Sequence, residues 1–208
     1  GGGTVCAGDP LPNVDFNFTG TAPFNFTYTD GVTPVVVTNY GSTTFTIVGA
    51  AAGNYQVTAL SDANGCNATD LGGTVAVIVN PLPTATVSGG GSVCTGDVLP
   101  DVTFTFTGTA PFNFTYTDGV TPVVVTNHGS TTFTIPTAAV GTYSITALSD
   151  ANCTGTNLGG SVSVIVNPLP TASVTGGGTV CAGDPLPNVD FNFTGTAPFN
   201  FTYTDGVT

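Results

Sequence analysis

The sequence predicts an all-β protein made of tandem repeats, and three observations support this prediction. The segment VCAGDPLPNVDFNFTGTAPFNFTYTDGVT stands at residues 5–33 and recurs, letter for letter, at 180–208. The 208 residues include no Lys, Arg, Glu, Met or Trp, so helix-forming residues other than Ala are scarce. β-branched and aromatic residues alternate with Thr and Asn in short runs that Gly, Pro and Asp separate, which is the pattern of half-buried strands.

The repetition has a long period of 175 residues, which contains two similar units. The stretch TGTAPFNFTYTDGVTPVVVTN, for example, is identical at 19–39 and 107–127. We therefore expect three units: one at 1–79 that lacks its first strand, a complete one at 80–166, and the first part of a third at 167–208. We also expect strands of further repeats or of neighbouring chains to complete the two incomplete units.

The complete unit is predicted to contain seven short strands with one apolar face each. They are expected at 84–88, 101–108, 111–119, 122–127, 131–135, 142–148 and 161–166. In the second of them, Val102, Phe104 and Phe106 share one face, and the threonines between them share the other. Seven alternating strands in just under 90 residues predict an immunoglobulin-like (Ig-like) β-sandwich, and two prolines in each NPLP junction predict that the sandwiches form a rod.

Two tyrosines strengthen the Ig-like interpretation. Tyr55 in AAGNYQVTA and Tyr143 in AVGTYSITA stand near the start of the sixth strand of their units. This spacing resembles a tyrosine corner, in which the tyrosine hydroxyl bonds to the backbone a few residues upstream. Trp is absent and no cysteines lie on the second and sixth strands, so the antibody type of domain is not expected.

A more specific resemblance rests on the segment GGGTVCAGDPLPNVDFNFTGTAPFNFTYTDG together with ALSDANGC. They resemble the tandem Ig-like or PKD-like repeats of giant surface proteins that gliding bacteria export by type IX secretion, including gliding adhesins and grappling-hook-type surface filaments. Those repeats carry a VC-x-G segment and, near their end, a loop with a cysteine. Here Cys6 and Cys66 occupy these places in one unit, and Cys94 and Cys153 in the next.

The resemblance implies a function in structure and adhesion, with no enzyme activity in these repeats. We expect an extracellular segment, at the cell surface, that gives a giant fibre its length, stiffness and protease resistance. The expected partners are other copies of the chain in a homo-oligomeric filament, and a cell-surface or glycan target bound elsewhere in the parent protein. The alternative is an array of carbohydrate-binding modules, or a stalk, on a secreted enzyme. That alternative requires exposed aromatic platforms such as Tyr40, which His128 replaces in the second unit.

The charge and hydropathy of the chain argue against nucleic acid and membranes as partners. All twelve charged side chains are Asp, which gives a net charge of −12. Such a chain repels phosphate groups, so neither nucleic acid nor an anionic membrane surface is an expected partner. No apolar run approaches the ~20 residues that a membrane-spanning helix needs, so membrane insertion is not expected.

The five cysteines are predicted to form structural disulfides, because secreted β-rich arrays with two cysteines in each unit use them in this way. The pairs expected within units are Cys6 with Cys66 and Cys94 with Cys153, while Cys181 is expected to pair with a residue beyond the sequence. The alternative is a bridge to the next unit, which requires the first cysteine of a unit to lie at the pole that faces its neighbour.

No cofactor or catalytic residue is expected. The loop at 61–70 offers Asp62, Asn64, Asn67 and Asp70 as oxygen ligands, but it lacks the spacing of an EF-hand. We interpret these residues as turn and cap residues, with Ca²⁺ at the domain junctions as the alternative. His128 has no nucleophile and orienting acid beside it in the sequence, and is interpreted as a turn residue.

Overall fold

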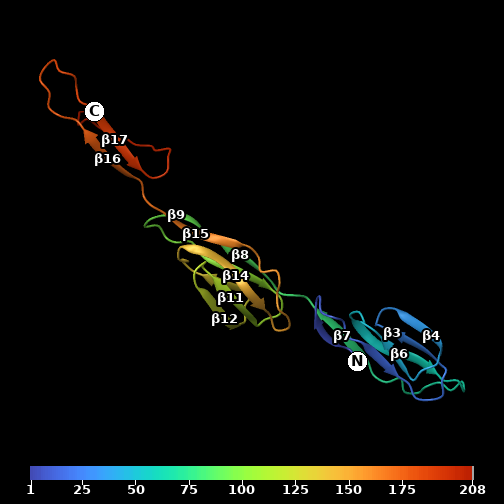
Figure 1. Ribbon diagram of the computed structural model, residues 1–208. Helices are drawn as coiled ribbons and strands as arrows, with labels where there is room; N and C mark the ends of the chain where they lie inside the picture. Colours follow the sequence, from blue (N-terminus) through green and yellow to red (C-terminus); the bar gives the residue numbers. More distant parts are fainter. Residues whose placement is uncertain (208) are drawn as a thin grey trace.

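The computed structural model describes residues 1–207, and its regular structure there consists of β-strands. The strands fall into three groups that follow one another along an elongated molecule, the first in blue and teal, the second in green, yellow and orange, and the third in darker orange and red (Figure 1). Within residues 1–207, no helix is long and apolar enough to cross a membrane.

The second repeat is a two-layered β-sandwich. One sheet has the order β13-β10-β8, and the other has the order β12-β11-β14-β15-β9. The strands are β8 (Thr84–Gly89), β9 (Gly91–Cys94), β10 (Val102–Thr107), β11 (Phe112–Thr117), β12 (Pro122–His128), β13 (Thr132–Ile135), β14 (Gly141–Ser149) and β15 (Ser161–Asn167). Neighbouring strands are antiparallel except β15 and β9, which are parallel. The predicted fold class, a tandem Ig-like β-sandwich, is confirmed.

Alternation along the strands builds the core of this sandwich. Phe104 and Phe106 on β10 are 0% and 2% exposed, while the threonines between and after them point to the other face. From the opposite sheet, Phe112 and Phe114 pack against them, with a ring-centroid distance of 4.7 Å between Phe106 and Phe114. Burial of apolar area of this kind is the main driving force for folding.

One strand of the second repeat was not expected from the sequence. β9 (Gly91–Cys94) adds an eighth strand, and it pairs in parallel with β15, so that Cys94 lies opposite Asn167. The chain leaves β8 in one sheet and enters the other sheet through Gly89 and Gly90, which have φ values of 85° and 68°. A Cβ atom at Gly89 would collide with the carbonyl oxygen of Asp101, so glycine is required at this crossing.

The first repeat has the same architecture with one strand fewer. Its sheets have the orders β1-β7-β6-β3-β4 and β2-β5. The strands are β1 (Gly3–Cys6), β2 (Val14–Asn17), β3 (Phe24–Thr29), β4 (Pro34–Tyr40), β5 (Thr44–Ile47), β6 (Gly53–Ser61) and β7 (Val75–Asn80). β2 is the counterpart of β10, but among the described residues no strand takes the place of β8 on its other side.

A groove lies along the free side of β2. It has a volume of about 460 Å³ and is lined by Phe16 and Phe18, by Val57 and Leu60 of β6, and by residues 70–75. In the second repeat the corresponding space is occupied by β8, which pairs with β10 and contacts β14 and β15. The groove therefore has the position and the lining of a strand-binding site.

In the described part of the third group, up to residue 207, there is a single pair of strands, β16 (Thr171–Gly176) and β17 (Val189–Thr194). They are antiparallel and correspond to β8 and β10 of the second repeat. The expected unit boundaries fall close to the ends of strands, because β7 ends at Asn80 and β15 ends at Asn167.

Candidate functional site, a disulfide-bridged junction between repeats

The end of the first repeat that faces the second carries Cys6. This residue ends β1 and lies opposite Asn80, the last residue of β7, because β1 and β7 are parallel. Residues 6–9, here called the exit turn, are held by three hydrogen bonds. The Ala7 N–H donates to the Asn80 carbonyl (2.8 Å), the Asp9 N–H to the Cys6 carbonyl (3.0 Å), and the Cys6 N–H to the Asp9 carboxylate (3.3 Å). The parallel strand thus places Cys6 where the chain leaves the repeat.

The facing end of the second repeat carries Cys153 in the connection between β14 and β15. Residues 150–153, here called the entry loop, fold around the carboxylate of Asp150. Its Oδ1 accepts hydrogen bonds from the N–H groups of Asn152 (2.8 Å) and Cys153 (2.6 Å), and its Oδ2 accepts one from the N–H of Thr109 (2.8 Å). The side chain of Asp150 therefore ties the entry loop to the turn between β10 and β11.

Asp150 is the one buried charged residue among those described, with an exposed fraction of 8%. Burial raises the pKa of its carboxyl, but the hydrogen bonds from the backbone N–H groups of Thr109, Cys153 and Asn152 outweigh burial and hold the pKa below its usual value. The carboxylate is thus ionised at neutral pH, and it acts as a fixed acceptor that shapes the entry loop.

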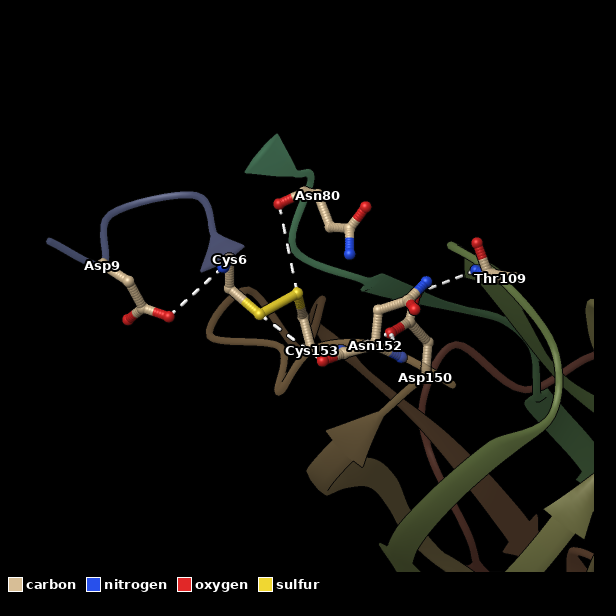
Figure 2. The surroundings of a disulfide bond; sticks show 7 residues. All are labelled: Cys6, Asp9, Asn80, Thr109, Asp150, Asn152 and Cys153. Atoms are coloured by element: carbon tan, nitrogen blue, oxygen red, sulfur yellow. Dashed lines mark hydrogen bonds between the residues drawn. A yellow bond between two sulfur atoms is a disulfide. The ribbon is translucent and has the colours of Figure 1, made fainter. Parts of the chain in front are cut away.

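A disulfide joins the exit turn to the entry loop. Cys6 and Cys153 are bonded with a Cα–Cα distance of 5.8 Å, although 147 positions separate them in the sequence. Figure 2 shows the bridge between the end of β1 and the loop of the second repeat, with the Asn80 carbonyl 4.0 Å from the Cys153 sulfur. At this junction Cys153 is only 5% exposed, whereas its neighbours Asn152 and Thr154 are exposed.

The disulfides expected within repeats, Cys6 with Cys66 and Cys94 with Cys153, are therefore wrong. In each pair the two cysteines lie at opposite ends of their repeat. Cys6 is beside the last residue of β7, whereas Cys66 precedes the first, and six strand residues at about 3.3 Å each put those ends about 20 Å apart. A disulfide needs Cα atoms within about 7 Å. Cys66, Cys94 and Cys181 have free thiols and are exposed.

The linker between the repeats is short and partly buried. It consists of Pro81, Leu82 and Pro83, of which Pro83 is fully buried in the second repeat. Together with residues of the exit turn and the entry loop, Leu82 lines a hollow of about 570 Å³ at the junction. Two separate covalent connections, the linker and the disulfide, thus join the two sandwiches.

Both predicted tyrosine corners have the expected geometry. The hydroxyl of Tyr55 donates a hydrogen bond to the carbonyl of Ala51 (2.9 Å), and that of Tyr143 donates to the carbonyl of Ala139 (3.0 Å). Both tyrosines are buried, and burial raises their pKa values. This hydrogen bond to the backbone a few residues upstream defines the tyrosine corner of Ig-like folds.

Tyr40 and His128 perform the same structural task in their repeats. The hydroxyl of Tyr40 donates to the Thr44 carbonyl (2.6 Å), and Nε2 of His128 lies 2.9 Å from the Thr132 carbonyl oxygen. The ring of Tyr40 packs edge-on against Phe45 at 5.3 Å, and the ring of His128 packs in the same way against its counterpart. Both side chains therefore close a hairpin, as the interpretation of His128 as a turn residue requires.

The carboxylate of Asp62, in the loop at 61–70, accepts hydrogen bonds from its own loop. Oδ1 of Asp62 accepts hydrogen bonds from the N–H groups of Asn64 (3.0 Å) and Cys66 (3.1 Å), and Oδ2 accepts from the side-chain amide of Asn64 (3.3 Å). Among the described residues there is no group of three or more His, Cys, Asp or Glu side chains arranged to hold a metal ion. The hydrogen bonds are those of turn and cap residues.

Solved structures similar to this chain share its fold. The structure titled "I-band fragment I67-I69 from titin" has a TM-score of 0.51 and 13% sequence identity, and the match covers 96% of this chain and 74% of that one. The "3Ig structure" of an E-to-A variant of the same titin domains has a TM-score of 0.51 and 13% sequence identity, and the match covers 95% of this chain and 74% of that one. No family model matches the chain, and no curated protein matches it. The likeness establishes tandem Ig-like domains.

Proposed function

We propose that this chain is a structural repeat segment of a giant extracellular adhesive fibre or surface filament, and that it provides length, stiffness and protease resistance. The Cys6–Cys153 disulfide is the observation that carries the proposal, because it joins two neighbouring repeats and neither repeat needs it to form its own sheets. A crosslink at this place restricts the movement of one repeat relative to the other. We assign no catalytic role to the segment.

Stiffness follows from the number of connections at the junction. A single three-residue linker allows neighbouring domains to bend and to rotate about it, even when prolines restrict its backbone. The disulfide adds a second connection on another part of the interface, so bending and rotation now require strain in one of the two connections. With Pro83 buried as well, the repeats are held end to end, as Figure 1 shows.

Composition supports a role outside the cell. The absence of Lys and Arg removes every cleavage site for trypsin-like proteases, and twelve aspartates keep the surface acidic. A structural disulfide is also typical of oxidising, extracellular surroundings. Together with the motifs around Cys6 and Cys66, these features support assignment to the repeats of type IX-secreted surface proteins of gliding bacteria.

Open strand edges support the proposed assembly with other copies of the chain. The groove along β2 has the lining of a strand-binding site, and the third group exposes apolar residues that a complete sandwich would cover. Four of them are Val174, Val189, Phe201 and Tyr203, which are 53–67% exposed. Strands from a further repeat or from another copy in a homo-oligomeric filament complete both sites.

The alternative role as an array of carbohydrate-binding modules has little support. Such modules present flat, exposed aromatic rings, but the rings of Tyr40 and His128 are packed edge-on against phenylalanines. Among the described aromatic residues, only Phe201 and Tyr203 are largely exposed, and both lie in the third group, where they contact other aromatic rings.

Immunogold electron microscopy of the cells that make this protein tests the proposal. Antibodies against the purified chain should label filaments or fibres on the cell surface, at many places along each filament because the repeats recur. Labelling confined to the cell interior, or to globular secreted particles without filaments, would contradict the proposed function. Labelling only at filament tips would contradict the role in length and stiffness.

A further inference from the structure

The three free cysteines occupy the same places in their repeats as the two bridged ones. Cys66 lies in residues 62–66, the entry loop of the first repeat, and Cys94 begins residues 94–97, the exit turn of the second. Cys181 begins the exit turn of the third repeat at residues 181–184. All three thiols are exposed, so each is accessible to a reaction partner.

The entry loop of the first repeat is already folded like the bridged one. In it, Asp62 takes the place of Asp150. Its carboxylate accepts hydrogen bonds from the N–H groups of Cys66 (3.1 Å) and Thr21 (3.4 Å), the counterparts of Cys153 and Thr109. The N–H of Asp62 also donates to the carbonyl of Cys66, as Asp150 does to Cys153. The loop is one residue longer, because Gly65 stands between Asn64 and Cys66, but the backbone N–H of Cys66 is bound to the equivalent carboxylate, as that of Cys153 is.

The exit turn of the second repeat is also folded like the bridged one. The N–H of Cys94 donates to the Asp97 carboxylate (3.0 Å), and the N–H of Asp97 donates back to the Cys94 carbonyl (3.0 Å). The Thr95 N–H donates to the carbonyl of Asn167 (2.9 Å), the counterpart of the bond to Asn80 in the first repeat. Cys94 is therefore fixed at the outer end of the second repeat, as Cys6 is at the first.

From this correspondence we propose that Cys66 and Cys94 are complementary crosslinking sites, at which every junction of the array is closed by a disulfide. Cys66 bonds to the cysteine of an exit turn, and Cys94 bonds to the cysteine of an entry loop. The partner is a repeat of this same kind, either in the same polypeptide or in another copy of the chain. The pairing is directional, because two exit turns or two entry loops do not form the interface seen at Cys6 and Cys153.

The bond-forming step is an oxidation and needs an acceptor for two electrons. We assign this part to a thiol–disulfide oxidant, such as a small-molecule disulfide or a disulfide oxidoreductase. One thiolate attacks the oxidant, forms a mixed disulfide and releases one oxidant thiol. The second cysteine displaces the other oxidant thiol, so two protein thiols become one disulfide while one oxidant disulfide becomes two thiols.

Oxidation of the purified chain in a glutathione buffer tests the directional pairing. At high protein concentration, non-reducing electrophoresis and peptide mapping should show chains linked from Cys66 to Cys94 or Cys181. Random pairing of one entry-loop thiol with two exit-turn thiols gives as many turn–turn as loop–turn links. We expect loop–turn links in about tenfold excess, the ratio that a preference of ~1.4 kcal/mol produces.

Two matched variants make this test specific. Cys66→Ser removes the only free entry-loop thiol and should abolish the loop–turn links, as should Cys94→Ser combined with Cys181→Ser, and neither alters the Cys6–Cys153 bond. Equal amounts of turn–turn links in the unmodified chain would overturn the proposal, and so would thiols that carry only glutathione. This result is independent of the proposed function, since it is read from disulfides and not from filaments.

Native surface material distinguishes the two sources of the partner. Both sources leave the same crosslinked peptides, with an exit-turn cysteine bound to an entry-loop cysteine, and material without such peptides would overturn the proposal. If the partner is another copy, reductant lowers the apparent mass of the protein on a gel to that of single chains. If the partner is a repeat of the same polypeptide, the mass stays that of one chain.

Discussion

The first and second repeats have nearly the same core residues, but only the second is closed by a strand that the linker delivers. Phe104 and Phe106 of β10 are 0% and 2% exposed under β8, whereas their counterparts Phe16 and Phe18 beside the open groove are 8% and 6% exposed. Because β8 directly follows Pro83, the same segment both connects the repeats and completes the core of the second. The junction and the fold of the second repeat are thus coupled.

The entry loop of the second repeat is also more buried than that of the first. Asp150 and Cys153 are buried at the bridged junction, while Asp62 is partly exposed and Cys66 is exposed. The corresponding hydrogen bonds are shorter at the bridged loop, 2.6 Å against 3.1 Å from the cysteine N–H and 2.8 Å against 3.4 Å from the threonine N–H. The entry loop that is bridged to a neighbouring repeat is therefore more buried, and has shorter hydrogen bonds, than the entry loop that is not bridged.

Removal of the junction disulfide should have the largest effect. In the variant with Cys6→Ser and Cys153→Ser, the free energy of unfolding should fall by about 5 kcal/mol, since the chain-entropy account gives that value for a closed loop of this length. Urea unfolding followed by tyrosine fluorescence measures the loss.

The control for this variant is Cys66→Ser with Cys94→Ser, which removes two exposed thiols and no disulfide. Its free energy of unfolding should change by less than about 0.5 kcal/mol. Equal losses of unfolding free energy in the two double variants would show that the Cys6–Cys153 bond does not stabilise the folded chain.

Truncation of equivalent core phenylalanines should separate the closed repeat from the open one. Phe104→Ala should destabilise the second repeat by about 4 kcal/mol, because it leaves a cavity in a fully packed core. Phe16→Ala should cost the first repeat less, since its ring borders an open groove and not a fully packed core. Calorimetry that resolves the two unfolding transitions measures both. A larger cost for Phe16→Ala would refute the view that β8 completes the core.

Loss of the Asp150 carboxylate should cost about 2 kcal/mol at neutral pH, because Asp150→Ala leaves buried N–H groups without an acceptor. Folding lowers the pKa of Asp150, so its stabilisation is present above the ordinary aspartate value of about 3.9 and is lost as the pH falls through the lower folded value. The difference between the variant and the unmodified chain should therefore shrink on acidification.

Thermal unfolding at pH 6 and at pH 2.5 checks this dependence. Asp62→Ala in the more exposed loop is the matched control and should cost less at pH 6. A constant cost of Asp150→Ala at both pH values would mean that the ionised carboxylate does not shape the entry loop.

The smallest effect is expected at the tyrosine corners, where the two repeats should behave alike. Tyr55→Phe and Tyr143→Phe each remove one hydrogen bond to a backbone carbonyl, with nearly equal lengths of 2.9 Å and 3.0 Å, so each should cost about 1 kcal/mol. Denaturant unfolding measures both losses. A loss at one corner only would show that the difference between the repeats extends beyond the β8 edge.

The sequence predicted those parts of the fold that local patterns determine. Alternation around Phe104 and Phe106 predicted the inward face of β10, and the spacing around Tyr143 predicted a hydrogen bond that forms as expected. The turn interpretation of Asp62 also agrees with its hydrogen bonds. Each of these features depends on residues close together in the sequence, or on simple periodicity.

The sequence favoured disulfides within repeats, but the structure shows the alternative, a bridge to the next repeat, because the pairing depends on a long-range contact. The segment GSVC ending at Cys94 is short and follows two glycines, so it has little strand pattern of its own, and its partner β15 lies about 70 residues later. That parallel pairing moves the first cysteine of each repeat to the outer end. Cysteine spacing is the same whether the bridge lies within or between repeats, so the sequence alone left both open.

Non-reducing peptide mapping tests the bridged junction most directly. Digestion of the oxidised Cys181→Ser chain with a protease that cleaves before aspartate places each remaining cysteine in its own peptide, with Cys6 in 1–8, Cys66 in 62–69, Cys94 in 70–96 and Cys153 in 150–183. We predict that peptide 1–8 is recovered bound to peptide 150–183. Recovery of 1–8 bound to 62–69, with 70–96 bound to 150–183, would place the disulfides within repeats and contradict the account.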